Sequence, residues 1–391
     1  MIAEEEAREK VLEKIRVRAS RGVSLSLALN CFAAKDYFSA LALPNFDNSA
    51  MDGYAVVASA CGVAKRLRVI GEQPAGLDRK LRVSPGEAIR IFTGAPMPAG
   101  ADAVVMQEDV TRESSEIVMN ADVDPGDFVR RRGCDLTEGQ KIVANGEPIR
   151  ATTIALFASQ GFREVSVGGE VDAAIISTGD ELAEPGGKLQ PGQIYESNSV
   201  LLQALLQRCG AVVKSVGHCK DEADSLRKTF EQATKHSVLI INGGVSVGEH
   251  DLVQSTLRSL GAKIDIWRVA IKPGKPFVFG RIRKCTVFGL PGNPVSAFVT
   301  FLQFVRPAIF KMMGAANFDL PKVPAKLIAD LRNESDRPHY IRGKCENGNF
   351  LPVGRQESHA LFGLSQSNAL LRLAVGEVRT CGDIVDIELF N

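Results

Sequence analysis

The second half of the chain alternates between short apolar runs and segments with apolar residues at helical spacing. Apolar runs predict strands at residues 171–176, 211–216, 238–241, 264–269, 277–280 and 286–289. Between them, residues such as Leu202, Leu206 and Cys209 share one helical face, and Gly210 follows as a stop signal. This alternation predicts a doubly wound α/β domain, with a last long helix after Pro291.

The first 170 residues and the tail follow other patterns. Helices are expected at residues 3–18, 25–34 and 148–162, the last ending at Gly161. Short β-branched runs between Gly and Pro predict a β-rich domain at 44–132, with strands at 66–70, 88–92, 103–107 and 116–119. The tail from about residue 318 returns to short β runs, as in a small sandwich or a partly open barrel.

Composition and charge narrow the class of protein. A chain of 391 residues exceeds the usual size of a single core, so more than one domain is expected. The formal net charge of +1 offers no general attraction to nucleic acid or to an anionic membrane. The eight cysteines are scattered without a C-x-x-C pair, and no apolar run is long enough to span a bilayer. We therefore expect a cytoplasmic protein with reduced thiols.

Polar clusters follow the predicted strands at the point where each strand ends. These clusters are residues 178–181, Asp221, residues 243–251, residues 272–275 and residues 291–296. Open α/β sheets bind ligands at the carboxyl ends of their strands. The five loops are therefore expected to converge on one crevice.

Two of these loops suit an anionic ligand. The glycine-rich segment 243–248, which contains Gly243, Gly244, Ser246 and Gly248, can offer backbone N–H groups to a phosphate. It is neither a dinucleotide-binding G-x-G-x-x-G nor a P-loop. Lys272 and Lys275 flank a Pro-Gly turn and suit an oxyanion, although a solvated hairpin tip is the alternative interpretation.

Carboxylates stand opposite the anion-binding loops. They are Asp180, Glu181, Asp221 and Asp251, with Asp52 and Asp135 as contributors from another domain. Carboxylates beside a phosphate repel it unless a hard cation lies between them, so Mg²⁺ is the predicted metal. For Asp180, capping of a following helix is the alternative.

The segment 46–55 places two carboxylates, an amide and a hydroxyl in a turn-forming stretch. Asp47, Asn48, Ser49 and Asp52 favour tight turns, and Gly53 tolerates unusual dihedral angles. A plain turn entering a strand is the simpler interpretation. A second loop, after residues 90–92, presents Thr93 before Gly94.

Six motifs stand in an order that resembles the MoeA/gephyrin E-domain family of molybdopterin molybdenumtransferases. They are residues 47–55 (DNSAMDGYA), 93–95 (TGA), 177–182 (STGDEL), 243–248 (GGVSVG), 272–276 (KPGKP) and 291–294 (PGNP). The resemblance covers essentially the whole chain. The sequence shows no counterpart of the adenylylating domain that is fused to the eukaryotic members.

The resemblance implies four parts: a helical scaffold from residues 1–43 and 133–167, a β-rich domain at 44–132, a molybdopterin-binding, adenylyltransferase-like α/β domain at 168–315, and a C-terminal β domain at 316–391. It implies a homodimer whose active cleft is shared between subunits. The implied reaction inserts molybdenum from molybdate into adenylylated molybdopterin, with release of AMP in a Mg²⁺-dependent step. Molybdopterin adenylyltransferase and molybdoenzyme acceptors are the implied partners.

The resemblance also implies roles for individual residues. Its activity-linked positions correspond to Asp52, Thr93, Asp135, Glu181, Asp221 and Asp251, of which Glu181, Asp221 and Asp251 are the expected Mg²⁺ ligands. The expected substrate, phosphate and molybdate contacts are Ser177, Thr178, Gly179, Gly243, Gly244, Ser246, Gly248, Lys272, Lys275, Pro291, Asn293 and Ser365.

The tail departs from the family pattern, because His339 stands where an acidic residue is expected and the segment around Ser365 is poor in Gly and Ser. A non-catalytic pterin-binding scaffold and a molybdopterin adenylyltransferase are the alternative functions.

Overall fold

The computed structural model describes residues 1–245 and 252–390 and divides into two compact units. Unit 1 comprises Met1–Lys35, Ala144–Ala158 and Phe162–Asn391, and unit 2 comprises Asp36–Val143 and Ser159–Gly161. Unit 2 is therefore an insertion within unit 1, and each unit is described below by itself.

A seven-stranded mixed sheet forms the centre of unit 1, in the order β1-β19-β20-β21-β18-β14-β17. Its strands are β1 (Ile2–Ala3), β14 (Asp172–Thr178), β17 (Val212–Cys219), β18 (Val238–Asn242), β19 (Lys263–Ala270), β20 (Pro276–Ile282) and β21 (Cys285–Leu290). Strands β17, β14, β18 and β21 run parallel, whereas β20 is antiparallel to both of its neighbours. The carboxyl ends of the four parallel strands therefore meet at one edge.

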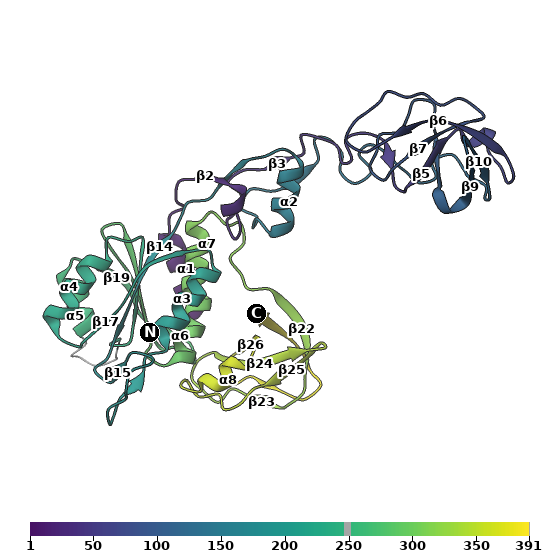
Figure 1. Cartoon of the computed structure of the whole chain (residues 1–391). Helices are drawn as coiled ribbons and strands as arrows, with labels where there is room; N and C mark the ends of the chain where they lie inside the picture. Colours follow the sequence, from purple (N-terminus) through teal and green to yellow (C-terminus); the bar gives the residue numbers. More distant parts are fainter. Residues whose placement is uncertain (246–251, 391) are drawn as a thin grey trace. The chain divides into compact units, whose positions relative to one another are not determined.

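Helices cover both faces of this sheet, which confirms the predicted doubly wound α/β class (Figure 1). They are α1 (Glu4–Lys14), α3 (Asn198–Arg208), α4 (Ala223–Ala233), α5 (Leu252–Ser259), α6 (Pro294–Thr300) and α7 (Arg306–Met312). Successive residues of β14 alternate between two cores: Ala173 and Ile175 pack with α1, α3, α6 and α7, while Ala174 and Ile176 pack with α4 and α5. The period of two explains why the strand is apolar on both sides.

One continuous apolar helix runs through this core. A π-helical turn (Phe301–Val305) joins α6 to α7, so Pro294–Met312 spans 19 residues. It is the one helix in the described part of the chain that is long and apolar enough to cross a membrane, yet 83% of its apolar window is buried inside the protein. Its burial is that of the core helix of a folded domain.

The C-terminal segment of unit 1 closes into a five-stranded barrel in the order β22-β25-β24-β26-β28, in agreement with the predicted barrel-like domain. The strands are β22 (Lys322–Leu327), β24 (His339–Glu346), β25 (Asn349–Pro352), β26 (Ala369–Leu373) and β28 (Ile384–Leu389). A separate pair, β23 (Leu331–Arg332) and β27 (Val378–Arg379), and the short helix α8 (Leu361–Ser365) complete the segment.

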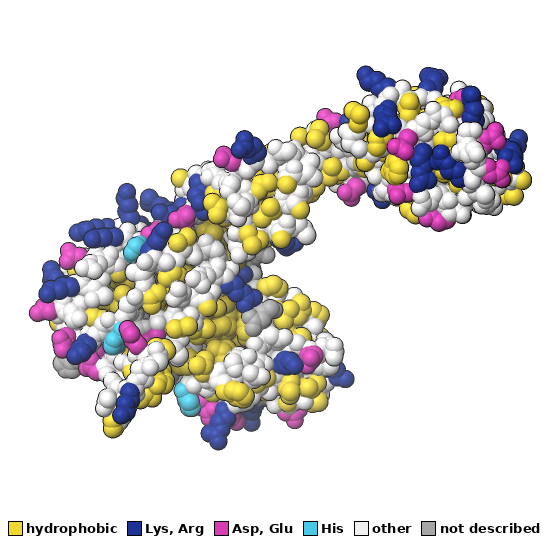
Figure 2. All heavy atoms as spheres, in the orientation of Figure 1, with side chains coloured by type: hydrophobic (Ala, Val, Ile, Leu, Met, Phe, Trp, Pro, Cys, Tyr) yellow, Lys and Arg dark blue, Asp and Glu magenta, His cyan; other side chains and the backbone are white. Residues whose placement is uncertain are grey.

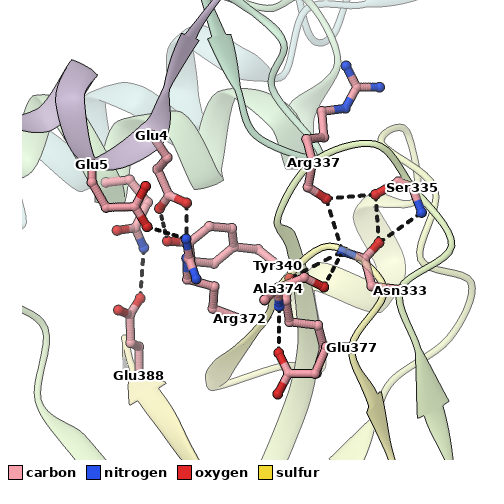
Figure 3. A network of polar contacts seen from close by, with 12 residues as sticks. Glu4, Glu5, Asn333, Ser335, Arg337, Tyr340, Arg372, Ala374, Glu377 and Glu388 are labelled. Carbon is pink, nitrogen blue, oxygen red and sulfur yellow. Dashed lines mark hydrogen bonds and ion pairs between the residues drawn. The ribbon is translucent and has the colours of Figure 1, made fainter.

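A buried polar network joins α1 to this barrel (Figure 3). The Tyr340 hydroxyl of β24 donates to Glu4 Oε1, and Arg372 Nε of β26 donates to Glu4 Oε2 at 3.0 Å. Burial raises the pKa of Glu4, although these two donors favour its charged form. Glu4 is only 6% exposed, so the network satisfies a carboxyl that would otherwise be costly to bury.

Tyr340→Phe is expected to lower the free energy of unfolding by about 1–3 kcal/mol, because it leaves a buried acceptor on Glu4 without its donor. Urea denaturation followed by far-ultraviolet circular dichroism measures the change. Tyr195→Phe is the matched control, since that hydroxyl donates to Gly187 O in an exposed loop. Equal losses in both variants would contradict a special role for the Glu4 network.

The remaining part of unit 1 and all of unit 2 are mostly β structure. In unit 1, β2 (Arg21–Ser24) pairs with β13 (Glu164–Val167). Helix α2 (Ala151–Ser159) belongs to unit 1 up to Ala158 and ends before Gly161, which has φ of +81°. Unit 2 holds a six-stranded sheet in the order β8-β5-β7-β6-β10-β9. Its strands are β5 (Gly53–Val56), β6 (Arg66–Gln73), β7 (Glu87–Ile91), β8 (Ala103–Met106), β9 (Val110–Glu113) and β10 (Glu116–Met119). Two further pairs are β3 (Tyr37–Phe38) with β12 (Lys141–Val143), and β4 (Asn48–Ser49) with β11 (Val129–Arg130).

The helix expected at residues 25–34 is wrong. Only Leu25–Leu27 form a single 3₁₀ turn, and Asn30 adopts a left-handed conformation with φ of +62°. Phe32 and Ala33 instead form β-bridges to Pro148 and Val167. Pairing with distant segments thus overrides the local helical preference.

Candidate functional site

A hollow of about 550 Å³ lies at the carboxyl ends of the parallel strands; we call it the acidic cavity. Its lining includes Thr178, Gly179, Glu181, Tyr195, Glu196, Asn198, Asp221, Asn242, Gly243, Gly244, Asn293 and His359. The loops after β14, β17, β18 and β21 all contribute. Four of the five loops expected to converge therefore contribute to this cavity, and the fifth, residues 272–275, lines the adjoining cavity described below.

Glycines let the loops approach one another closely. A Cβ on Gly243 would lie 2.4 Å from the carbonyl oxygen of Thr178, and one on Gly244 would lie 2.4 Å from the Thr178 hydroxyl. A Cβ on Gly179 would lie 2.7 Å from Glu181 Oε2, so the Glu181 carboxylate lies close over this glycine. Larger residues at these positions would displace the carboxylate and the glycine-rich loop.

Carboxylates concentrate negative charge at this cavity. Partial burial raises the pKa of Asp221, and the neighbouring charges of Asp180 and Glu181 raise it further. Such repulsion favours a cation among these oxygens, which are hard ligands of the kind that Mg²⁺ prefers. Asp180 itself precedes β15 (Leu182–Ala183), which pairs with β16 (Ile194–Tyr195), so the alternative role as a helix cap is wrong.

No group of three or more His, Cys, Asp or Glu side chains in residues 1–245 and 252–390 is placed to hold a metal ion. Glu181 and Asp221 line the cavity, whereas Asp251 lies outside the described residues. A protein that supplies two carboxylates and leaves the other positions to phosphate and water fits the usual coordination of Mg²⁺.

The structure adds two residues that the sequence did not single out. Glu196 is 8% exposed, accepts from Ser199 N at 2.9 Å, and lines the acidic cavity. Asn198 donates through Nδ2 to Asn242 Oδ1 at 2.8 Å and to Gly292 O, so its Oδ1 remains without a hydrogen-bond partner among the described residues. This Oδ1 is a natural acceptor for a ligand N–H group.

A second hollow of about 540 Å³ adjoins the first; we call it the basic cavity. Its lining includes Lys272, Pro273, Gly274, Lys275, Pro291, Ser296, Arg337, Gln356 and Ser358. The two cavities share Val245, Gly292, Asn293 and His359. Adjacent acidic and basic hollows suit a ligand pair in which a metal-bound phosphate group lies beside a second oxyanion.

The barrel holds the lysine loop in place. Lys272 N donates to Pro338 O at 2.9 Å, and Tyr340 N donates to Lys272 O at 2.8 Å. Asn333, which is fully buried, donates to Arg337 O at 3.0 Å (Figure 3). The basic cavity is therefore built jointly by the α/β domain and the barrel, and the solvated hairpin tip considered for this loop is wrong.

His339 leaves the positive charge of this region uncompensated. Burial lowers its pKa to about 4, assisted by the charges of Lys272, Arg342 and Arg337. The neutral imidazole offsets none of the positive charge around Lys272, whereas the acidic residue expected from the family pattern would offset part of it.

The depressed pKa of His339 predicts a pH-dependent stability. The unfolded chain binds a proton near pH 6.5, whereas the folded one binds it only near pH 4. Stability should therefore fall as the pH drops from about 6.5 to about 4, by on the order of 2 kcal/mol. Urea denaturation of the wild type and His339→Gln at pH 7 and pH 4.5 measures the difference. An equal loss in both proteins would contradict the assignment.

In unit 2, the structure brings Asp52 and Thr93 together. Asp52 Oδ1 accepts from Thr93 N at 2.7 Å and from Thr93 Oγ1 at 2.8 Å. The backbone N–H and then the hydroxyl of Thr93 lower the pKa of Asp52, so this exposed carboxylate stays ionised. The turn of residues 46–55 thus does more than enter a strand, because its acid is oriented by a second loop.

The structural reason for Gly53 differs from the expected one. Its φ lies outside the left-handed region, but a Cβ there would lie 1.9 Å from Val105 O in β8. Close strand approach, and not an unusual dihedral angle, requires the glycine. Nearby, Asp47 accepts from Arg132 N at 2.7 Å and from Arg131 Nη1 at 2.8 Å, and these two donors lower its pKa.

Other expected site residues lie elsewhere. Asp135 is exposed in unit 2, and its backbone N donates to Leu43 O. Ser177 is buried and donates to Glu196 at 3.1 Å, while Ser365 donates to Phe362 O within α8; neither lines the two cavities. Ser246, Gly248 and Asp251 lie outside the described residues.

Fold and site together define a multidomain protein with two adjoining cavities at the strand ends of its α/β domain. One cavity is lined by carboxylates that suit a metal ion, and the other is lined by lysines that suit an anion. Family models match in chain order: MoeA N-terminal region (domain I and II) at residues 2–161, a probable molybdopterin binding domain at 174–311, and MoeA C-terminal region (domain IV) at 324–390. The chain belongs to the MoeA family of molybdopterin molybdenumtransferases, which are transferases of molybdenum cofactor biosynthesis.

Individual relatives are similar to this chain over most or all of its length. The molybdopterin molybdenumtransferase of Haemophilus influenzae is 37% identical over 402 residues, covering 100% of this chain and 99% of the relative. That of Nostoc is 39% identical over 354 residues, covering 87% and 81%. The crystal structure of the MoeA molybdopterin biosynthesis protein of Pyrococcus horikoshii covers 100% of both chains at 31% identity, with a TM-score of 0.81. The expected family is confirmed.

Proposed function

We propose that this protein inserts molybdenum from molybdate into adenylylated molybdopterin in a Mg²⁺-dependent reaction that releases AMP. The observation that carries the proposal is the pair of adjoining cavities, one lined by Glu181 and Asp221 and the other by Lys272 and Lys275. One cavity suits a phosphate group with its metal, and the other suits a tetrahedral oxyanion. We also propose that the reaction takes place in the cytoplasm.

Each side chain has a distinct task in this proposal. Glu181 and Asp221 would hold Mg²⁺, which supplies positive charge that offsets the pyrophosphate of the substrate. Lys272, Lys275 and Arg337 bind and orient molybdate, since they line one hollow beside the shared residues Gly292 and Asn293. The backbone N–H of Gly244 orients the phosphate, because that of Gly243 already donates to Leu290 O at 3.2 Å.

Incubation with adenylylated molybdopterin, molybdate and Mg²⁺ tests the proposal. We expect stoichiometric AMP release together with formation of cofactor that activates an apo-molybdoenzyme. Tight binding without turnover would instead indicate a non-catalytic pterin-binding scaffold. Formation of adenylylated molybdopterin from ATP and molybdopterin would indicate an adenylyltransferase.

We further propose that the protein acts as a homodimer in which Asp52 serves the cavities of the other subunit. The support is the family resemblance together with the local geometry of Asp52, an ionised carboxylate oriented by Thr93 and exposed on unit 2. The proposed reaction partners are the adenylyltransferase that supplies the substrate and the molybdoenzymes that accept the product.

Mixed dimers test the trans arrangement. Asp52→Ala and Glu181→Ala proteins, each inactive alone, are expected to regain part of the activity after unfolding and refolding together. About half of the subunits would pair as heterodimers, each with one intact site, so about one quarter of wild-type activity is expected. No recovery, although mass spectrometry shows heterodimers, would place Asp52 and Glu181 in the same subunit's site.

A further inference from the structure

A third hollow, of about 390 Å³, lies in unit 1 away from both cavities; we call it the basic pole. It is lined by Lys14, Arg16, Val17, Arg18, Ala19, Ser237, Arg281, Arg283, Lys284, Thr286 and Met312. Six of these residues are Lys or Arg, and no Asp or Glu of the described chain is among them. Figure 2 shows Lys and Arg side chains gathered along one margin of the lobe that holds the sheet.

The basic pole lies at the opposite edge of the sheet from the two cavities. Ser237 immediately precedes β18, whereas Gly243, which lines the acidic cavity, immediately follows it. Six residues of extended chain separate their Cα atoms by about 20 Å. A ligand at the basic pole therefore would not contact the proposed reaction site.

The cations of the basic pole are not neutralised by ion pairs. Among the described residues, none of the six forms a salt bridge to a carboxylate. Arg281 donates through Nη2 to Lys14 O at 2.9 Å, which fixes one guanidinium against the end of α1. The nearby Asp172 does not line the hollow, and it accepts from Ser237 Oγ and from His236 Nδ1. Like charges held together without counter-ions favour an anionic ligand.

Two further features accompany the cations. Thr286, which is 8% exposed, lines the same hollow and brings a hydroxyl beside them. Arg283 adopts φ of +53° in the two-residue connection between Ile282 and Cys285, a position that favours Gly or Asn. The chain thus keeps an arginine where its backbone is unfavourable, beside a lysine and in the hollow that Thr286 also lines.

We propose that the basic pole binds a small ligand that carries two or more linked phosphate groups. Arginine forks and lysine ammonium groups match phosphate oxygens, and the Thr286 hydroxyl adds a donor in the hollow. The volume falls in the range of pockets for small molecules, which favours a compact polyphosphate over an extended nucleic acid. Inorganic polyphosphate and a nucleoside triphosphate share this chemistry.

Isothermal titration calorimetry of the full chain with tripolyphosphate at low ionic strength tests the proposal. The charge reversal Arg283→Glu/Lys284→Glu should weaken binding by at least about 30-fold, since repulsion replaces attraction at close range. The matched control Arg227→Glu/Lys228→Glu makes the same charge change on α4 and should change affinity by less than about twofold. Equal weakening in both variants would overturn the proposal.

Four more measurements separate the alternatives. The Lys272→Ala/Lys275→Ala protein should retain tripolyphosphate binding; loss there would assign the ligand to the basic cavity and overturn the proposal. ATP binding with the same dependence on Arg283 and Lys284 would support a nucleoside triphosphate as ligand, and absence of ATP binding would support inorganic polyphosphate. Stronger binding of a polyglutamate peptide than of tripolyphosphate would overturn the proposal in favour of a protein partner. AMP release by the Arg283→Glu/Lys284→Glu variant should be unchanged, so failure here is distinguishable from failure of the proposed function.

Discussion

Glu181→Ala is expected to lower the rate of AMP release from adenylylated molybdopterin by on the order of 10³-fold, with the fold unchanged. Glu181 lies close over Gly179 at the rim of the acidic cavity, and no side-chain hydrogen bond to it is found in the described part of the chain. Its carboxylate is therefore free for a cation. Its loss also relieves the repulsion that raises the pKa of Asp221.

Glu184→Ala is the control for this experiment, because Glu184 is an exposed acid of the same connection and does not line the cavity. Single-turnover AMP release at several Mg²⁺ concentrations measures the effect, and circular dichroism melting checks the fold. The Glu181 variant should also need more Mg²⁺ for half-maximal rate. An unchanged rate of AMP release would remove Glu181 from the mechanism.

Lys272→Ala/Lys275→Ala is expected to raise the KM for molybdate by at least about 50-fold, because two positive charges are removed from one partly desolvated hollow. At saturating molybdate, the Mg²⁺ concentration that gives the half-maximal rate of AMP release should change much less, since these lysines line the basic cavity and not the acidic one. The two cavities thus predict separable defects: one in the metal-dependent step and one in molybdate saturation.

Lys228→Ala/Lys235→Ala is the matched control, since these two exposed lysines lie on and just after α4 and line neither cavity. Initial rates over a range of molybdate concentrations measure KM and kcat separately. If the double lysine variant kept the wild-type KM for molybdate, the oxyanion site would have to lie elsewhere.

Much of the fold could be predicted because many of the sheet strands carry a local apolar signal of their own. The apolar run at residues 238–241 became β18, and the run at 116–119 became β10 with the expected bounds. The helix expected at 25–34 failed because Phe32 and Ala33 bridge to residues more than a hundred positions away. No local pattern reports such a pairing.

Prediction of the functional site from the sequence meets the same limit. Polar loops at strand ends predicted that Glu181, Asp221 and Lys272 would lie near one another, because topology alone brings parallel strand ends together. Arg337 could not be predicted, since it enters the basic cavity from the barrel through contacts such as Lys272 N with Pro338 O. Asn198 could not be predicted either, because its unused oxygen follows from a hydrogen-bond network that involves Asn242 and Gly292.

The first residues of the chain complete the edge of the central sheet, and this has a consequence for synthesis on the ribosome. Ile2 pairs with Val269, and Glu4 meets Tyr340, so the N-terminus must wait until most of the chain has been made. Unit 2, from residue 36 to 143, has its own core and needs none of the later strands. Translation therefore favours folding of the inserted unit first, with the N-terminal segment exposed in the meantime.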